Sequence, residues 1–393
     1  MEKYDFDTVV PRRGTNSYKW DTPEQEGVLP MWVADMDFRA APCIVEALQR
    51  RVSHGVFGYT RVPAAYYDAV TDWFARRHGW RIDPHWILYT TGVVPALSAV
   101  IKALTVPGDR VIVQTPAYNC FYSSIRNNGC ELLANRLRYE GGAYTIDFDD
   151  LETKASDPKA KLLLLCNPHN PVSRVWKREE LQALIDLLAR YGAYLIADEI
   201  HADFVYAPEQ FVPVLSLAQK NVLSLCAASK TFNLAGLEQA AMLVPDEAVR
   251  AKINTEMERA GVRSGNLFAL EGTRAAYEYG DAWLDGLMHY LDGNRKHLTA
   301  LVKQELPQAV LTPMEATYLG WLDLRAYGMN CEELMARTLK HGVQFTEGTF
   351  FGEGGEGFLR VNIGCPRRNI TEGIHRLKEA LDEAVEEKAH GVD

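Results

Sequence analysis

The sequence lacks the patterns of several large protein classes. No uninterrupted apolar run approaches the roughly 18 residues that suggest a membrane span, so we expect no membrane partner. The chain has no GxxxxGK[ST] phosphate loop, no HExxH and no cysteine pair at CxxC spacing, so neither a nucleotide hydrolase nor a metal site is expected. Positive charge is in deficit, with 42 Lys and Arg against 52 Asp and Glu. An acidic chain repels phosphate backbones, which makes nucleic acid a poor candidate partner.

Cysteines are few and unpatterned. The seven are an odd number, and several lie inside apolar runs, which is typical of reduced thiols used as small buried hydrophobes in a cytoplasmic protein. The opening MEKYDFDTVVPRRG has no apolar core, so we expect no signal peptide and a cytoplasmic location. The 393 residues, 47% of them hydrophobic, are enough for two or three globular units at roughly 100–200 residues each.

Short apolar runs alternate with helical patterns through the middle of the chain. The runs are continuous rather than alternating in polarity, which predicts strands buried on both faces of a mostly parallel sheet. Amphipathic stretches such as 179–191 lie between them, so we expect an α/β fold with helices around the sheet. The predicted strands are Trp86–Tyr89, Arg110–Gln114, Lys161–Cys166, Tyr194–Ala197, Val222–Cys226 and Ala241–Val244.

The last third of the chain reads as a smaller α+β unit. Helical patterns are expected at 281–306, 331–341 and 370–388, and strands at 318–324 and 358–363. We therefore expect a large domain over residues 45–280 and a small domain formed by 1–44 and 281–393.

Ligands of parallel sheets bind beyond the carboxyl ends of the strands, so the residues that follow each run are the candidates. After the first run, Gly92 precedes Val93, Val94 and a helix start, which is either a plain turn or an anion site built from free amide groups. After the third run comes NPHNP, where two prolines fix a rigid loop around Asn170. The Asn170 amide is either part of a turn or an orienting donor.

Two further strand ends carry ionisable groups. Asp198 ends the fourth run and is followed closely by His201; an acid at this place is either a metal ligand or a fixed counter-ion. Lys230 follows the fifth run between small residues and a Phe, where desolvation would favour the neutral, nucleophilic amine.

Arg360 lies inside the apolar run FLRVNIG and needs an anionic partner, either a structural carboxylate or that of a substrate. The stretch GEGGEG at 352–357 satisfies GxGxxG. It precedes a strand and carries two glutamates, so we interpret it as a loop and not as a dinucleotide site.

Together these groups supply an anion site, an orienting amide, a buried acid, an imine-forming lysine and a carboxylate-binding arginine. That set fits pyridoxal 5′-phosphate, which presents a phosphate, a phenolic oxygen, a ring nitrogen and an aldehyde.

The order NPHNP, Asp198, Lys230 resembles the fold-type I pyridoxal-phosphate enzymes. More narrowly, PMWVADMDF, FGYT, TGVVPALSAVI, TPAYNCFY, DEIHADFVY, SKTFNLAGL and LRVNIGCP resemble the MalY/PatB branch, the cystathionine β-lyases and related cysteine-S-conjugate C–S lyases. The resemblance covers essentially the whole chain. It implies a large domain with a mostly parallel seven-stranded sheet, and a homodimer with active sites at the subunit interface.

The resemblance also implies roles for individual residues. Lys230 would bind the cofactor covalently and move the proton at the substrate α-carbon, and Arg360 would hold the substrate α-carboxylate. The other implied roles are Asp198 on the ring nitrogen, Asn170 and His201 on the phenolic oxygen, Tyr118 stacked on the ring, the backbone of Val93 and Val94 on the phosphate, and Tyr59 reaching the neighbouring subunit's site.

Three positions depart from the family pattern. Ala227 replaces a phosphate-binding hydroxyl, for which Ser229 would compensate, and Glu238 stands where aminotransferases place an Arg. Ser173 replaces a Gly, and a positive φ there would cost stability.

The expected reaction is β-elimination of a thiol from L-cystathionine or a related L-cysteine S-conjugate, with release of pyruvate and ammonia. The alternatives are a pyridoxal-phosphate aminotransferase acting on an amino acid, and a regulatory binding protein that uses the same fold.

Overall fold

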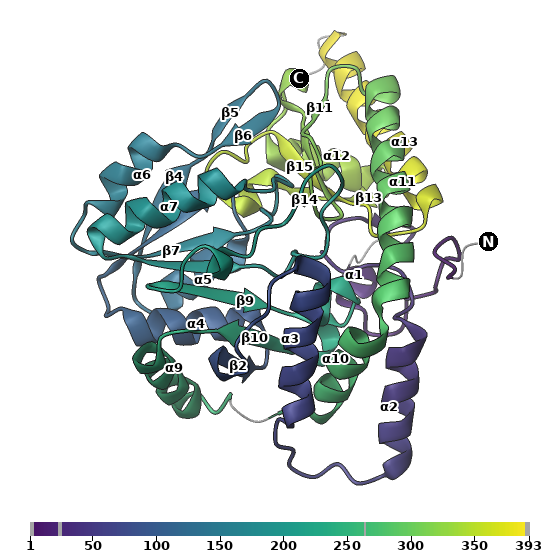
Figure 1. The fold of residues 1–393 in the computed structure, drawn as a ribbon. Helices are drawn as coiled ribbons and strands as arrows, with labels where there is room; N and C mark the ends of the chain where they lie inside the picture. The colour runs from purple at the N-terminus through teal and green to yellow at the C-terminus, as the bar shows by residue number, and fades with distance from the viewer. Residues whose placement is uncertain (1–3, 23–25, 263–264, 390–393) are drawn as a thin grey trace.

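The computed structural model describes residues 4–22, 26–262 and 265–389 (Figure 1). Seven strands form its largest sheet, in the order β2-β10-β9-β8-β7-β3-β4. Every neighbouring pair is parallel except the two pairs that include β10. This confirms the predicted α/β class with a mostly parallel seven-stranded sheet. The strands are β2 (Ile87–Thr90), β3 (Arg110–Thr115), β4 (Glu131–Arg136), β7 (Ala160–Cys166), β8 (Tyr194–Asp198), β9 (Val222–Cys226) and β10 (Ala240–Leu243).

The continuous apolar runs reflect burial on both sides of this sheet. Along β7, Leu162 and Leu164 pack into one buried cluster, and Leu163 and Leu165 pack into another, because successive strand side chains point to opposite faces. Helices cover both faces (Figure 1). The first cluster includes α4 (Val93–Leu104), α5 (Asn119–Asn127) and α9 (Glu247–Arg259), and the second includes α3 (Ala64–His78), α7 (Arg178–Tyr191) and α10 (Leu267–Tyr279).

The predicted strand ends agree with the structure to within one residue, whereas β4 was not predicted. This edge strand begins with two exposed residues and has a single buried residue, Asn135, so it has no continuous apolar run. Several further helices and strands of the first 231 residues lie outside this sheet. They are α1 (Tyr18–Asp21), α2 (Pro42–His54), β5 (Arg138–Glu140), β6 (Ala143–Thr145), α6 (Phe148–Ala155) and α8 (Ala228–Thr231).

A second, antiparallel sheet has the order β11-β12-β15-β14. Its strands are β11 (Val310–Leu311), β12 (Leu319–Asp323), β15 (Phe358–Asn362) and β14 (Thr346–Glu347). The long helices α11 (Asp281–Glu305) and α13 (Arg367–Ala389) run side by side next to it, with α12 (Cys331–Lys340) beyond (Figure 1). From the other end of the chain, β1 (Leu29–Pro30) pairs in parallel with β13 (Val343–Gln344). The division into 45–280 and 1–44 with 281–393 stays a prediction.

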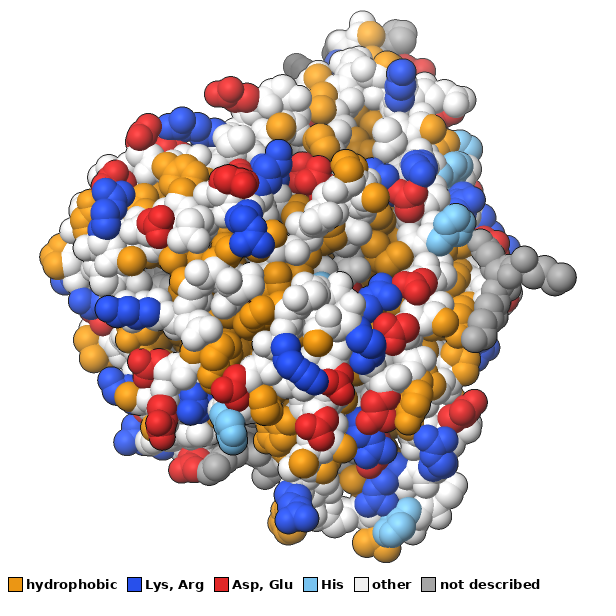
Figure 2. Space-filling view, in the orientation of Figure 1, with side chains coloured by type: hydrophobic (Ala, Val, Ile, Leu, Met, Phe, Trp, Pro, Cys, Tyr) orange, Lys and Arg blue, Asp and Glu red, His pale blue; other side chains and the backbone are white. Residues whose placement is uncertain are grey.

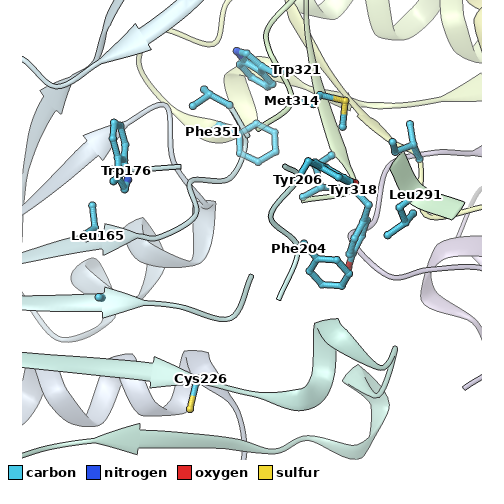
Figure 3. Packing of buried hydrophobic residues seen from close by; sticks show 14 of the residues in the cluster. Leu165, Trp176, Phe204, Tyr206, Cys226, Leu291, Met314, Tyr318, Trp321 and Phe351 are labelled. Atoms are coloured by element: carbon cyan, nitrogen blue, oxygen red, sulfur yellow. The ribbon is translucent and has the colours of Figure 1, made fainter. Parts of the chain in front are cut away.

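The buried core is continuous between the two sheets. Leu165 of β7, Cys226 of β9 and Trp321 of β12 belong to the same cluster (Figure 3). The rings of Phe204 and Tyr318 meet edge to face between them, with centroids 5.0 Å apart. On the face in Figure 2, basic and acidic side chains are interspersed. No helix of the described residues is long and apolar enough to cross a membrane.

Candidate active site

The candidate residues meet at one edge of the seven-stranded sheet. Because β3, β7, β8 and β9 are parallel, the residues that follow them lie at the same edge. Tyr118, Asn170, Asp198 and Lys230 line a single cavity of about 240 Å³ there. Four more of the predicted site residues line the same cavity: Val93, Val94, His201 and Ser229.

One wall of this cavity is the start of α4. Gly92 has a φ of 147°, which a residue with a side chain rarely adopts, and it ends β2 so that α4 can begin at Val93. The helix has no side-chain cap. The first amide groups of a helix have no partner within the helix, and the helix dipole adds partial positive charge there. The start of α4 is therefore a candidate site for an anion.

Lys230 enters the cavity from the last turn of α8. Its Nζ donates to the carbonyl oxygen of Ala34 at 2.6 Å, and the next residue, Thr231, donates its hydroxyl to Asp203 at 2.6 Å. Burial lowers the pKa of Lys230 to about 8, and the nearby cation of Arg360 adds to the effect. The neutral amine that nucleophilic attack requires is thus present at a lower pH than in an ordinary lysine.

Two consecutive acids end β8, and they face different surroundings. Glu199 is held inside the protein by Asn167 Nδ2, the Val214 amide (both 3.0 Å) and the Ser224 hydroxyl. Asp198 lines the cavity, and its carboxylate accepts the Ile200 amide at 3.2 Å. Burial raises the pKa of Asp198 to about 7, a cost that a cation in the cavity would offset.

His201 is a neutral group in the same wall. Burial lowers its pKa to about 3, and the positive charges of Lys230 and Arg360 act in the same direction. Its Nδ1 is buried and has no hydrogen-bond partner within the described part of the chain. Because a buried polar atom without a partner is costly, this nitrogen indicates a polar ligand atom in the cavity.

Arg360 is a buried cation without an acid beside it. Its side chain comes from β15 and is only 5% exposed. The guanidinium donates to Asn170 Oδ1 at 3.0 Å and to the Trp32 carbonyl at 2.8 Å, and it lies over the Phe351 ring. No carboxylate of the described residues forms an ion pair with it. Of the two partners considered for Arg360, the described residues provide no structural carboxylate, so its charge is available to a ligand anion.

The contact with Arg360 fixes the orientation of the Asn170 amide. Arginine can only donate hydrogen bonds, so the amide oxygen must face Arg360, and the NH₂ group is directed elsewhere. Asn170 lines the cavity, where this NH₂ group is available to an oxygen acceptor. The rigid NPHNP loop is held in turn by His169, whose Nε2 donates to the Pro116 carbonyl at 2.8 Å.

Comparisons with known proteins agree with this arrangement. The family model for class I and II aminotransferases matches residues 27–377. Cystathionine beta-lyase PatB of Bacillus subtilis is 46% identical over 96% of this chain and 99% of its own length. The chain belongs to this family. Protein MalY of Escherichia coli is 34% identical over 96% of this chain and 99% of its own, which places the chain in the MalY/PatB branch.

A solved structure of the family supports the fold as well. The pyridoxal-phosphate-bound C–S lyase of Staphylococcus hominis is 31% identical, with a TM-score of 0.91, over 96% of this chain and 98% of that one. The agreement over both whole chains confirms the fold-type I architecture.

The departures from the family pattern have visible consequences. Glu238 lines the cavity with a φ of 52°, and Ser229 lines it as well, whereas Ala227 is a buried apolar residue. Ser173 has a φ of 59°, so it adopts the positive φ that was expected to cost stability at this position. Its hydroxyl bonds to Thr317 Oγ1 at 2.9 Å and to the Leu319 carbonyl, contacts that a glycine would lack.

Two predicted site residues do not line this cavity: Arg360 lines an adjoining, larger cavity that shares Tyr118 and Lys230 with the first, and Tyr59 lines neither. The side chain of Tyr59 is 108% exposed, in the segment between α2 and α3. Val56 and Phe57 of the same segment are also exposed, so the segment is an apolar arm at the molecular surface.

Several cavity residues escaped the sequence reasoning. The carbonyl groups of Trp32 and Ala34 contact Arg360 and Lys230, and Tyr318 donates to Ala34 at 2.9 Å. The sequence identified PMWVADMDF only as a family motif. Any residue has a backbone carbonyl group, so the residue types at 32 and 34 do not indicate that these carbonyl groups accept hydrogen bonds in the site. Cys166 and Gln239 also line the cavity, and nothing in their local sequence distinguishes them from core residues.

Proposed function

We propose that this chain is a pyridoxal-phosphate-dependent C–S β-lyase that releases a thiol, pyruvate and ammonia from L-cystathionine or a related L-cysteine S-conjugate. The observation that carries the proposal is the buried Arg360 cation, which has no acidic partner among the described residues and lines the same cavity as Lys230. An amino-acid substrate would present its carboxylate to Arg360 and its reactive α-carbon to Lys230. The 46% identity to a cystathionine β-lyase over nearly the whole chain supports the same substrate class.

The residues of the smaller cavity fit pyridoxal phosphate. The unpartnered Nδ1 of His201 and the amide of Asn170 match an oxygen substituent on the ring, and the α4 start matches the phosphate. Burial raises the pKa of the Asp198 carboxyl, and the positive charge of a protonated ring nitrogen would favour its ionised form. When bound, the cofactor supplies an aldehyde for imine exchange and a ring that accepts the electron pair left at the α-carbon.

The protein groups then have separate tasks. Arg360 binds and orients the substrate carboxylate, and Tyr118, common to both cavities, covers the ring. Lys230 would hold the cofactor and would move the proton at the substrate α-carbon, a task suited to its pKa, which burial lowers to about 8. Ser229 and the amides of Val93 and Val94 would hold the phosphate, because the described residues that line this cavity include Glu238 and no arginine.

The exposed arm supports a homodimer with shared active sites. A second copy that covers Val56, Phe57 and Tyr59 would bury apolar surface and bring Tyr59 to the neighbouring cavity. Mixing Tyr59→Ala and Lys230→Ala chains tests this arrangement, because a mixed dimer would contain one intact site and regain activity. We further propose a cytoplasmic location, consistent with seven cysteines that are all free.

The decisive assay separates the lyase from an aminotransferase. The cofactor-loaded enzyme is incubated with L-cystathionine and with S-phenyl-L-cysteine, and pyruvate is measured without any added keto acid. Pyruvate release supports the lyase. Amino transfer that requires a keto acid, without pyruvate, would replace the proposal by an aminotransferase, and a protein that acquires no visible-range cofactor absorbance would support a non-catalytic binding role.

A further inference from the structure

A second cavity, of about 540 Å³, adjoins the first and shares Ala34, Tyr118 and Lys230 with it. It extends to Arg360 and contains none of the Gly92–Pro95 residues that begin α4. The first cavity is therefore the cofactor side, and the second is the substrate side. With the α-carboxylate on Arg360 and the α-carbon at Lys230, the rest of the second cavity is left for the group attached to the substrate sulfur.

The wall of this remaining space is largely apolar. Side chains from the N-terminal segment, α12 and the region of β13 and β14 surround it, which favours an apolar substituent by the hydrophobic effect. These apolar and aromatic residues are Tyr18, Trp32, Val33, Met335, Phe345 and Phe350.

The other polar side chains of the wall are neutral or acidic. Of the described residues that line the cavity, Arg360 and Lys230 alone are cationic, and the proposed reaction uses both. Glu347 of β14 also lines it and has no ion-pair partner among the described residues. Gln344 adds a buried amide oxygen with no hydrogen-bond partner in the described chain. A second carboxylate on the substrate would therefore meet an acid and no free cation.

We propose, on the basis of the lyase function above, that the enzyme prefers cysteine conjugates whose leaving thiol is apolar and carries no net negative charge, and that Glu347 disfavours anionic leaving groups such as 3-mercaptopropionate. In the reaction the Cβ–S bond breaks with its electron pair on sulfur, the α-proton passes to Lys230, and one water is consumed. The products are the thiol, pyruvate and ammonia.

Three conjugates of nearly equal size test the selectivity. They are S-propyl-L-cysteine, S-(2-carboxyethyl)-L-cysteine and S-(2-aminoethyl)-L-cysteine, which end in a methyl, a carboxylate and an ammonium group. For the cofactor-loaded enzyme, we expect kcat/KM for the propyl substrate to exceed that for the carboxyethyl substrate by at least tenfold, with the aminoethyl substrate well above the carboxyethyl one.

The Glu347→Gln variant identifies the residue responsible. It should reduce the propyl-to-carboxyethyl ratio several-fold by improving the anionic substrate. The matched control Glu353→Gln removes an exposed acid on the neighbouring loop, which lies outside the cavity 3.9 Å from Arg136, and should leave the ratio unchanged. Calorimetric binding of the same three compounds to cofactor-loaded Lys230→Ala gives a readout that does not depend on turnover, and the same order of affinity is expected.

The outcomes distinguish a failure of the proposed leaving-group selectivity from a failure of the proposed lyase activity. Pyruvate from all three conjugates at equal kcat/KM, or a ratio that Glu347→Gln does not change, overturns the selectivity and leaves the lyase intact. Pyruvate from none of the three, nor from cystathionine, overturns the lyase and the selectivity together.

Discussion

The Arg360 guanidinium donates to the Asn170 amide oxygen at 3.0 Å, so a residue proposed to hold the substrate is bonded to one proposed to hold the cofactor. The bond links β15 of the four-stranded sheet to the loop after β7 of the seven-stranded sheet. It keeps the Asn170 NH₂ group available to the cavity while leaving the charge of Arg360 uncompensated. The two binding functions are therefore coupled through one neutral amide.

Asn170→Asp tests this coupling. An acid at position 170 would pair with Arg360 and compete with the substrate carboxylate, so KM for a cysteine conjugate should rise at least tenfold, about 1.4 kcal/mol of lost binding. Asn170→Ala is the control, since it removes the amide but leaves Arg360 without an acid, and its KM should rise less. Steady-state kinetics of both variants decide, and equal KM values for wild type and Asn170→Asp would contradict the coupling.

Replacing Arg360 should separate stability from activity. A buried cation with no acidic partner contributes little to the stability of the fold, so Arg360→Met should leave the free energy of unfolding within about 1 kcal/mol of wild type or raise it. The same variant should lose at least a hundredfold in kcat/KM, because the charge-assisted contact to the substrate is gone. Urea unfolding and kinetics measure the two effects. A strong loss of stability would instead indicate a structural role for Arg360.

The rate of cofactor capture should follow the titration of Lys230. Only the neutral amine attacks the aldehyde, and burial lowers the pKa of Lys230 to about 8, so the neutral fraction grows as pH rises and levels off above that value. The rate at which apoprotein binds pyridoxal phosphate, followed by absorbance between pH 6 and 10, should show this rise. In Arg360→Met the midpoint should move upward, since a neighbouring positive charge is removed. A midpoint near 10.5 in the wild type would show that the amine is not desolvated.

The buried Glu199 should make the difference in free energy of unfolding between wild type and Glu199→Gln depend on pH. Burial raises the pKa of Glu199 to about 7, above its ordinary value of 4.5, so the folded protein holds a proton that the unfolded chain has released. This contribution is full below about pH 4.5 and is lost as pH rises through 7. Wild type should therefore lose roughly 2–3 kcal/mol relative to Glu199→Gln between pH 5 and 8. Glu353→Gln, at an exposed position, should show no such trend in parallel urea unfolding.

Sequence reasoning located the groups that stand directly beyond buried strands. Asp198 and Lys230 could be found because β8 and β9 are continuous apolar runs, after which a charged residue is conspicuous. The partners of Arg360 could not be predicted from the sequence, because the chain brings them together only in the fold. They are the Trp32 carbonyl and the side chains of Asn170 and Thr346, and Asn and Thr are common in turns and strands.

The missed features share a different cause. The Ala34 carbonyl that holds Lys230 lies 196 residues away in the chain, and a backbone oxygen has no residue-type signature. Strand β4 was missed because an edge strand that is half exposed lacks the apolar run that marks its neighbours.

The most direct test is the stoichiometry of thiol and pyruvate released from S-phenyl-L-cysteine by the cofactor-loaded enzyme with no keto acid present. The account predicts one thiol for each pyruvate in the wild type and in Lys220→Ala, which changes an exposed lysine, and neither product from a folded Lys230→Ala. Equal turnover by Lys230→Ala, or amino transfer in place of thiol release by the wild type, would contradict it.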